Sequence, residues 1–295
     1  MAEPIGIVTV GDALRRAAMG LREAGIESAH LDAEVLLSHV LGTRRERLYA
    51  HPEVRLSFGE YERYRAAVER RLTRLPVAYI TGKKEFMSLE FIVDEHVLIP
   101  RPETEVLVEE VLSRLRVPVA GDKQVVVADV GTGSGAIAVS VAHFHKTAEV
   151  IATDISSSAL AVARENARRH GVARRIRFLQ GDLMTPLAED GLENMITAIV
   201  SNPPYLSRRA MATLSPEVRH EPEGALLGGE QGLDLSKAIL RDSRPYLVPG
   251  GFVALEVGHD QGKALAEFAK EALGYGRVEI ILDLAGIERV IIACQ

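Results

Sequence analysis

The sequence predicts an α/β protein in which a small helical domain precedes a mostly parallel, seven-stranded sheet. After residue 104, helical patterns alternate with short apolar runs rich in β-branched residues, which is typical of a parallel sheet covered on both faces. The first 88 residues carry helical periodicity instead. The last two apolar runs are separated only by "LAGI". Because so short a link permits a hairpin but not a parallel crossover, we expect an antiparallel final strand.

Residues 1–88 are expected to form a helical bundle. Ser57 and Glu60 form a capping-box pattern at the start of one helix. Gly42 is the residue type that commonly ends a helix. Basic and acidic residues nearly balance here, which favours a globular module over a basic tail. The expected helices cover residues 11–26, 28–42 and 57–72.

The rest of the chain divides into a connector and a larger domain. Residues 89–103 are rich in β-branched residues and predict a short β-rich connector. Residues 104–295 are expected to form the larger domain, with Thr104 as the expected cap of its first helix. The expected strands of its sheet cover residues 125–130, 149–154, 175–180, 195–202, 251–257, 277–283 and 288–294.

The composition indicates a globular protein of the cytoplasm. The chain has 295 residues and a formal net charge of -6, which gives no support for nonspecific binding to nucleic acid. Cys294 is the single cysteine and the histidines lack ligand spacing, so we expect no disulfide and no metal. The N-terminus lacks a signal pattern, and no apolar run approaches the roughly 20 residues of a membrane span. We expect a monomer without a membrane partner.

A glycine-rich turn follows the first strand of the predicted sheet. "DVGTGSGAIA" places Gly131, Gly133 and Gly135 between strand and helix, where glycine permits a tight turn and close approach of a ligand. Asp154 ends the next strand, where a carboxylate can accept hydrogen bonds from two ribose hydroxyls. The turn also fits the relaxed dinucleotide pattern G-x-G-x-x-G/A, so by itself it leaves a nicotinamide site open.

Three further features favour S-adenosylmethionine as the cofactor. Asp129 stands just before the glycines, where it could face the ammonium group of the cofactor. Asp182 and Leu183 follow the third strand, where an acid can bind the adenine amino group and an apolar side chain can cover the ring. "SNPPY" ends the fourth strand. Because ligands of an open parallel sheet bind beyond the carboxyl ends of its strands, these features should share one crevice.

The "SNPPY" segment suits a planar amide or exocyclic amine, and it resembles the (D/N/S)PPY box of methyltransferases that act on such groups. The side-chain oxygen of Asn202 and the carbonyl of Pro203 could hold the two N–H groups of the target. Pro203 and Pro204 restrict the segment to extended conformations, which would fix both acceptors. Tyr205 can lie against the planar group. We expect Asn202, Pro203 and Tyr205 to be catalytic and the transfer to be direct, with positioning as the main contribution.

Several segments together are similar to the peptide chain release factor N(5)-glutamine methyltransferase family. They are "LIPRPETE" (98–105), "DVGTGSGAIA" (129–138) and "VSNPPY" (200–205), with "PVAYITGKKEF" (76–86) and "ALEVG" (254–258) in support. The resemblance implies a class I methyltransferase fold. It also implies that the substrate is the side-chain amide of the glutamine in the Gly-Gly-Gln loop of class I release factors.

The motifs and the resemblance together specify the expected site residues. Asn202, Pro203, Pro204 and Tyr205 would hold the target glutamine. The residues expected to bind the cofactor are Asp129, Gly131, Thr132, Gly133, Ser134, Gly135, Asp154, Asp182, Leu183 and Asn202. Leu183 departs from family members that carry an aromatic residue at this position.

Other residues leave alternatives open. Arg101 and Glu103 are assigned to substrate binding, with a rigid interdomain turn as the alternative. Glu256 is expected to finish a strand rather than to take part in chemistry. The polar segment 206–234 fits a binding loop and an ordinary loop nearly equally well.

Two rival activities use parts of the same pattern. An N(6)-adenine nucleic-acid methyltransferase would apply the same chemistry to a flipped base, but the chain lacks an obvious basic recognition domain. A nicotinamide-dependent oxidoreductase would leave "SNPPY" and the acid after the third strand unexplained.

Overall fold

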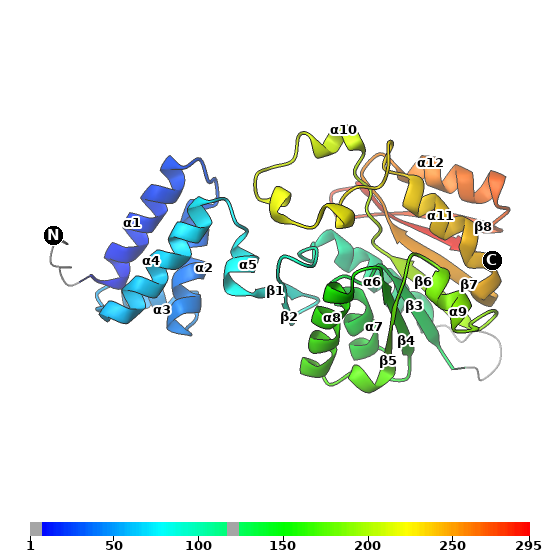
Figure 1. Cartoon of the computed structure of the whole chain (residues 1–295), viewed down its shortest axis with the longest axis horizontal. Helices are drawn as coiled ribbons and strands as arrows, with labels where there is room; N and C mark the ends of the chain where they lie inside the picture. Colours follow the sequence, from blue (N-terminus) through cyan, green and yellow to red (C-terminus); the bar gives the residue numbers. More distant parts are fainter. Residues whose placement is uncertain (1–7, 117–123) are drawn as a thin grey trace. The chain divides into compact units, whose positions relative to one another are not determined.

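The computed structural model describes residues 8–116 and 124–295 of the chain (Figure 1). These residues form two compact units. The first unit contains the chain up to Gly82 together with the short segment Ser215–His220. The second unit contains Lys83–Leu214 and Glu221–Gln295. One short segment from the middle of the sequence therefore belongs with the N-terminal helices.

The first unit is a bundle of helices, as the periodicity predicts. The Ser57 hydroxyl accepts a hydrogen bond from the Glu60 amide, and the Glu60 carboxylate accepts one from the Ser57 amide, so the capping box is confirmed. Gly42 ends a helix in the left-handed conformation, with φ of 60°. The helices are α1 (Val10–Glu23), α2 (Ala29–Leu41), α3 (Arg45–Ala50), α4 (Phe58–Leu72) and α5 (Val77–Thr81).

The core of this unit is formed by apolar side chains of α1, α2 and α4. Leu21, Leu36 and Leu37 are fully buried. Tyr64 is buried among them, and its hydroxyl donates a hydrogen bond of 3.1 Å to the carbonyl of Ala33. Since a buried phenol needs a partner for its O–H, this bond also fixes how α4 packs on α2.

The second unit contains the predicted seven-stranded sheet, in the order β5-β4-β3-β6-β7-β9-β8. The first five strands in this order run parallel, whereas β9 is antiparallel to both β7 and β8. The final strand is therefore antiparallel, as predicted, and it lies between β7 and β8. The strands are β3 (Val126–Val130), β4 (Glu149–Asp154), β5 (Ile176–Gln180), β6 (Ile196–Ser201), β7 (Leu247–Glu256), β8 (Arg277–Leu282) and β9 (Glu288–Cys294).

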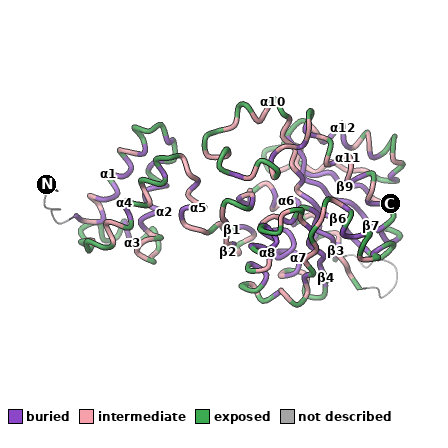
Figure 2. The backbone as a smooth tube through the Cα atoms, in the orientation of Figure 1, coloured by how far each residue is buried: buried purple, intermediate pink, exposed green. Residues whose placement is uncertain are grey.

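Helices cover both faces of the sheet, and the burial colours of Figure 2 mark its central strands as the buried layer, whereas the edge strands β5 and β8 are largely half-buried or exposed. Alternate residues of β3 serve opposite faces: Val127 packs with α6, α7 and α8, whereas Ala128 packs with α9, α11 and α12. This is why the strands read as continuous apolar runs. The helices are α6 (Glu103–Leu115), α7 (Ala136–Phe144), α8 (Ser157–Arg169), α9 (Thr185–Glu189), α10 (Arg208–Met211), α11 (Asp234–Ser243) and α12 (Gly262–Glu267).

Two local expectations differ from the structure. The β-rich segment begins earlier than expected and forms an antiparallel hairpin of β1 (Lys83–Phe86) and β2 (Leu89–Ile92). Thr104 does not cap α6, because the helix already begins at Glu103. Thr104 is instead buried, with 3% of its surface exposed, and its hydroxyl accepts a hydrogen bond from Asn202 of the predicted site. The prolines before α6 conceal this shift, since proline readily occupies the first turn of a helix.

Candidate functional site

The predicted site residues lie at the carboxyl ends of four adjacent parallel strands. Asp182 follows β5, Asp154 ends β4, residues 131–135 follow β3, and residues 202–205 follow β6. Backbone hydrogen bonds join these ends: Gly181 donates to Asp154, and Gly131 donates to Thr153. The edge of the sheet thus brings together residues that are far apart in the chain, from Asp129 to Tyr205.

The glycine turn has a backbone that other residues would adopt only with strain. Gly131, Gly133 and Gly135 have φ values of 74°, 54° and 80°. A Cβ added to Gly131 or Gly133 would meet no described atom within 4 Å, whereas one added to Gly135 would lie 3.0 Å from the Cβ of Ala163. The first two glycines therefore leave room for a ligand, and the third permits close packing against α8.

Asp129 is completely buried beneath this turn. Its Oδ2 accepts hydrogen bonds from the Thr132 hydroxyl at 2.6 Å and from the Ala138 amide at 3.0 Å. Its Oδ1 is buried and has no hydrogen-bond partner within the described chain. Burial raises the pKa of Asp129 to about 7 against these two hydrogen bonds, and the nearby charge of Asp154 adds to the rise. A cationic ligand group that paired with Oδ1 would satisfy it and favour the charged form.

Asp154 holds the glycine turn in place through both oxygens of its carboxylate. One carboxylate oxygen accepts from the Gly133 amide at 2.8 Å and the other from the Ser156 amide at 2.9 Å. Asp182 is exposed, and Leu183 is half-buried against the core with φ of 44°. Thr132 and Ser134 are buried. The structure thus brings the predicted cofactor residues together, while their contacts with a cofactor remain a prediction.

The segment after β6 is held in place from several sides. Asn202 Nδ2 donates a hydrogen bond of 3.1 Å to the Thr104 hydroxyl. Pro203 is buried, and Pro204 and Tyr205 are half-buried. Burial raises the pKa of the Tyr205 hydroxyl to about 12. With its amide nitrogen engaged, Asn202 keeps its side-chain oxygen as the acceptor for a ligand.

Glycines of the long loop pack directly on this segment. A Cβ added to Gly228 would lie 2.3 Å from the carbonyl oxygen of Pro204, and one added to Gly232 would lie 2.2 Å from that of Tyr205. Gln261 Nε2 also donates to the Tyr205 carbonyl at 2.9 Å. The close packing of Gly228 and Gly232 on residues 204 and 205 was not predicted from the sequence, although the "GG-x-x-G" spacing of residues 228–232 was a signal for close backbone approach.

Arg101 forms an ion pair with Glu221, whose other oxygen accepts from the Ile99 amide at 3.1 Å. Glu221 is 6% exposed. These bonds hold the loop against the residues that precede α6, which is a structural task for Arg101. Glu103, at the start of α6, is half-buried. The substrate-binding role of Arg101 and Glu103 stays a prediction.

Asn166 of α8 is a further residue that sequence reasoning missed. It is fully buried. Its Nδ2 donates to the carbonyl of Ser134 at 2.8 Å, and its Oδ1 accepts from the Ile92 amide at 2.7 Å. One side chain therefore fixes the glycine turn to the β1–β2 hairpin. An asparagine inside a helical pattern, flanked by apolar positions of the buried face, was the available signal.

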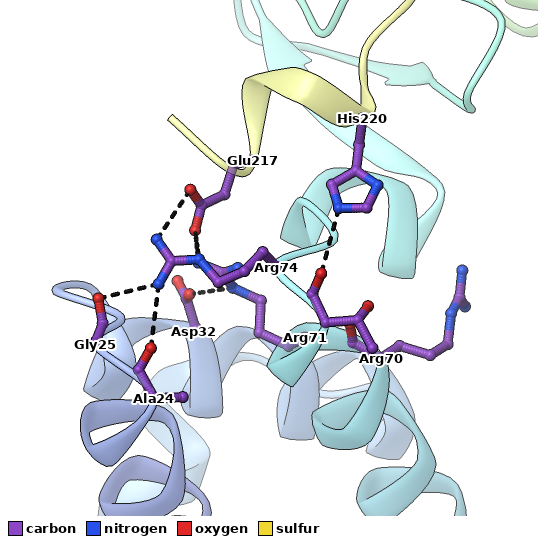
Figure 3. Close-up of polar contacts among 9 residues, drawn as sticks. Ala24, Gly25, Asp32, Arg70, Arg71, Arg74, Glu217 and His220 are labelled. Carbon is purple, nitrogen blue, oxygen red and sulfur yellow. Dashed lines mark hydrogen bonds and ion pairs between the residues drawn. The ribbon is translucent and has the colours of Figure 1, made fainter. Parts of the chain in front are cut away.

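The first unit carries a separate charged cluster around Glu217 (Figure 3). Arg71 donates to Asp32 at 2.7 Å and to Glu217 at 3.0 Å, while Arg74 lies 2.8 Å from Glu217. Burial would raise the pKa of Glu217, but hydrogen bonds from its own backbone and from Arg74 and Arg71 outweigh it, so the pKa is lowered. This cluster fixes Ser215–His220 to the helices of its unit.

The described residues contain neither a cluster of metal ligands nor a helix that could span a membrane. Within residues 8–116 and 124–295, no three His, Cys, Asp or Glu side chains gather closely enough to hold a metal ion. In the same ranges, no helix has the length and hydrophobicity that a membrane crossing requires.

Solved structures share the fold of this chain. A methyltransferase from Pyrococcus furiosus matches with a TM-score of 0.51 and 20% identity, over 72% of this chain and 91% of that one. The catalytic domain of hMettl16, in complex with the MAT2A 3'UTR hairpin 6, matches with a TM-score of 0.54 and 14% identity, over 80% of this chain and 82% of that one. At these identities the match concerns the methyltransferase fold alone.

Sequence comparisons identify the family. The family model described as PrmC N-terminal domain matches residues 12–82, and the model described as Methyltransferase small domain matches residues 103–218. A release factor glutamine methyltransferase of Moorella thermoacetica is 45% identical, over 96% of each chain. One of Bacillus subtilis is 41% identical, over 97% of each chain. Similarity of this extent covers both the helical and the sheet-containing parts, and the chain therefore belongs to the release factor glutamine methyltransferase family.

Proposed function

We propose that this enzyme transfers a methyl group from S-adenosylmethionine to the side-chain amide nitrogen of the glutamine in the Gly-Gly-Gln loop of class I peptide chain release factors. The observation that carries this proposal is the Asn202 amide, whose nitrogen is engaged by Thr104 while its oxygen remains available. The relatives' shared name supplies the substrate class.

The segment 202–205 would act by positioning. An amide nitrogen is a poor nucleophile because its lone pair is delocalised over the carbonyl. The Asn202 oxygen and the Pro203 carbonyl could accept the two N–H groups of the target and turn the lone pair toward the methyl donor. Gly228 and Gly232 let the loop backbone support Pro204 and Tyr205 at close range. A rigid pair of acceptors converts binding energy into orientation, which is the main source of rate in such a transfer.

The other residues at the sheet edge would hold the cofactor. S-adenosylmethionine, when bound, supplies an electrophilic methyl group on its sulfonium. The unpartnered Oδ1 of Asp129 fits its ammonium group, and the open space at Gly131 and Gly133 admits it close to the backbone. Asp154 and Asp182 would accept hydrogen bonds from the ribose and the adenine, with Leu183 against the ring.

The partner is proposed to be a protein that docks on the helical unit, with no direct nucleic-acid contact, and the enzyme is proposed to act as a cytoplasmic monomer. Tyr49 and Phe58 are 60% and 68% exposed on this unit, and exposed aromatic side chains are frequent anchors of protein interfaces. Hydrogen exchange of the full chain with and without release factor would map the docking surface. Protection confined to the second unit would contradict helical docking.

The cofactor assignment is tested by calorimetry with S-adenosylmethionine and with NAD. We expect the wild type to bind the former and not the latter. Asp154→Ala should lose about 1.5–3 kcal/mol of affinity, the scale of hydrogen bonds to a charged group. Asp154→Asn keeps an acceptor and should lose less. Binding of NAD instead of S-adenosylmethionine would refute the assignment.

The substrate assignment is tested by methyl transfer to purified release factor, with the modified residue located by mass spectrometry. We expect one added methyl group on the glutamine of the Gly-Gly-Gln loop, and none on a release factor in which that glutamine is replaced by alanine. Free glutamine should be a very poor substrate, because it lacks the remote contacts that support orientation. Efficient transfer to adenine in DNA or RNA would refute the assignment.

A further inference from the structure

Gln261, in the turn between β7 and α12, uses its side-chain amide to join three segments of the second unit. Its Oε1 accepts a hydrogen bond of 3.0 Å from the Gly258 amide. Its Nε2 donates to the Tyr205 carbonyl at 2.9 Å and to the Gly232 carbonyl at 3.2 Å. One side chain thus connects the segment after β6, the long loop of residues 206–234 and the turn after β7.

The orientation of the Gln261 amide follows from its partners. A backbone N–H can only donate, and a carbonyl oxygen can only accept. Oε1 must therefore face Gly258, and Nε2 must face the carbonyls of Tyr205 and Gly232. A reversed amide would set N–H against N–H at Gly258 and oxygen against oxygen at both carbonyls. Only one orientation of this side chain is therefore stable.

The loop makes room for this contact with a glycine. A Cβ added to Gly232 would lie 2.2 Å from the Tyr205 carbonyl oxygen and 2.9 Å from Gln261 Nε2. Side chains do not tolerate approaches this close, so glycine is what lets the loop backbone reach Tyr205 and Gln261 together.

Two backbone hydrogen bonds join the loop to the same segment one residue further along the chain. The Leu206 amide donates to the Leu226 carbonyl, and the Gly228 amide donates to the Leu206 carbonyl, each at 2.9 Å. They form an isolated parallel bridge between Leu206 and Leu227. So short a bridge opens at a low free-energy cost unless another contact supports it. The hydrogen bonds of Gln261 supply that support.

The two prolines carry this support to the acceptors of the proposed site. Each proline ring fixes its own φ and restricts the residue before it to extended conformations. Few backbone rotations therefore remain free between the Pro203 carbonyl and the Tyr205 carbonyl. A fixed Tyr205 carbonyl limits the positions that Asn202 and the Pro203 carbonyl can take.

We propose that Gln261 is a positioning residue for methyl transfer. By holding the Tyr205 carbonyl to the long loop, it keeps the Asn202 oxygen and the Pro203 carbonyl directed toward the target amide. The inference rests on the proposed function, since it assigns these two acceptors to the glutamine. Gln261 acts on the backbone of the substrate segment, so its loss should slow the transfer step without weakening cofactor binding.

The test uses three variants of the full chain. Gln261→Glu keeps an oxygen for the Gly258 amide, but an ionised carboxylate can only accept, so both donors are lost. Gln261→Met has a side chain of similar length without charge and removes all the hydrogen bonds of Gln261. Gln231→Glu is the matched control, because it introduces the same charge at an exposed residue of the same loop.

The kinetic constants separate orientation from binding. With release factor as substrate, we expect kcat to fall about tenfold in both Gln261 variants, the effect of one ordinary hydrogen bond. The KM for release factor and the cofactor affinity should change less than about twofold, and Gln231→Glu should stay near the wild type. A wild-type kcat in Gln261→Glu, or a loss confined to KM or to cofactor affinity, would overturn the inference while leaving the proposed function intact.

Hydrogen exchange gives a second readout that does not depend on activity. In protein labelled with ¹⁵N glycine and ¹⁵N leucine, we expect the Leu206 and Gly228 amides to exchange faster in both Gln261 variants than in the wild type and in Gln231→Glu. The Gly258 amide should stay slow in Gln261→Glu, which keeps its acceptor, and should become fast in Gln261→Met.

The amide of Leu255, a buried residue of β7, serves as the reference for the whole fold. Its exchange should stay the same in all variants, which separates local opening from general damage. Unchanged exchange at Leu206 and Gly228 in Gln261→Glu would overturn the inference. If the wild type bound S-adenosylmethionine but left release factor unmodified, the proposed function would fail, and exchange at these two amides would still decide whether Gln261 holds the segment.

Discussion

Asp129 and Glu256 lie at the carboxyl ends of β3 and β7, and both are buried with one carboxylate oxygen that meets no partner in the described chain. Burial raises the pKa of each to about 7. Their neighbours differ. Asp129 holds the backbone of a glycine turn that faces open space, whereas the charges of Glu103, Arg289 and Arg101 act on the pKa of Glu256.

The difference teaches how one sheet edge can serve two kinds of ligand. At the end proposed for the cofactor, the backbone of the glycines leaves open space, and the buried carboxylate of Asp129 would pair with a cationic group. At the end proposed for the substrate, the Thr104 hydroxyl accepts from the Asn202 amide, and glycines let the loop pack closely on residues 204 and 205. Binding of the cofactor and orientation of the substrate should therefore respond to different substitutions at these two ends.

The largest effect is expected from Asn202→Ala. Losing an acceptor that orients the target amide in the transition state should lower kcat by about a hundredfold or more. Cofactor affinity should change much less, because Asn202 stands at the substrate end. Parallel measurement of single-turnover rates and calorimetric affinity checks this. Equal losses in the single-turnover rate and in the cofactor affinity would contradict a separation of cofactor binding from substrate orientation.

A pair of glycine variants compares the two backbones directly. Gly131 and Gly232 have nearly equal φ values, 74° and 76°. A Cβ on Gly131 meets open space, whereas one on Gly232 would lie 2.2 Å from the Tyr205 carbonyl oxygen. Both alanine variants should lose about 1–2 kcal/mol from left-handed strain, and Gly232→Ala should lose about 1–3 kcal/mol more from overpacking.

Urea unfolding measures this difference in stability, and calorimetry completes the comparison. Gly131→Ala should impair cofactor binding more than Gly232→Ala, because its new methyl group would enter the space reserved for the ligand. The opposite ranking in both measurements would place the cofactor elsewhere.

The smallest effect concerns pH and Asp129. The charged form would attract the ammonium of the cofactor, and the pKa of about 7 means that this form is lost as pH falls. Cofactor affinity should therefore decrease below about pH 7, by at most about tenfold per pH unit. Asp129→Asn should bind more weakly and show little of this dependence, while Glu256→Gln should retain it. An Asp129→Asn variant that keeps the wild-type slope would assign the titration to another group.

Strand patterns and motifs predicted most of the fold. The continuous apolar runs of β3, β4 and β6 predict strands that are buried on both sides. The four-residue link before β9 excludes a parallel crossover. The order of the last two strands was not predictable. Whether β9 lies outside β8 or beside β7 depends on packing across the sheet rather than on the length of the link.

The supporting residues of the site were harder to predict than those of its motifs. Asn202 and the glycines stand in patterns with a physical meaning, so sequence alone brings them to one edge. Thr104 resembled a helix cap, but its hydroxyl instead accepts a hydrogen bond from Asn202, which lies 98 positions away in the chain. Local sequence carries no record of such a neighbour, since the contact arises when α6 packs beside the segment that follows β6.

The segment Ser215–His220 has a consequence for how this enzyme can be taken apart. The chain passes from one unit to the other three times, after Gly82, after Leu214 and after His220. A cut at residue 82 would separate Arg71 and Arg74 from Glu217 and leave charges unmatched in both pieces. The two units are thus not consecutive segments of the chain joined by a single linker. A gene rearrangement that exchanged the helical unit for another would also have to exchange the segment Ser215–His220, which lies far from it in the sequence. We therefore expect the two units to be inherited together as one chain.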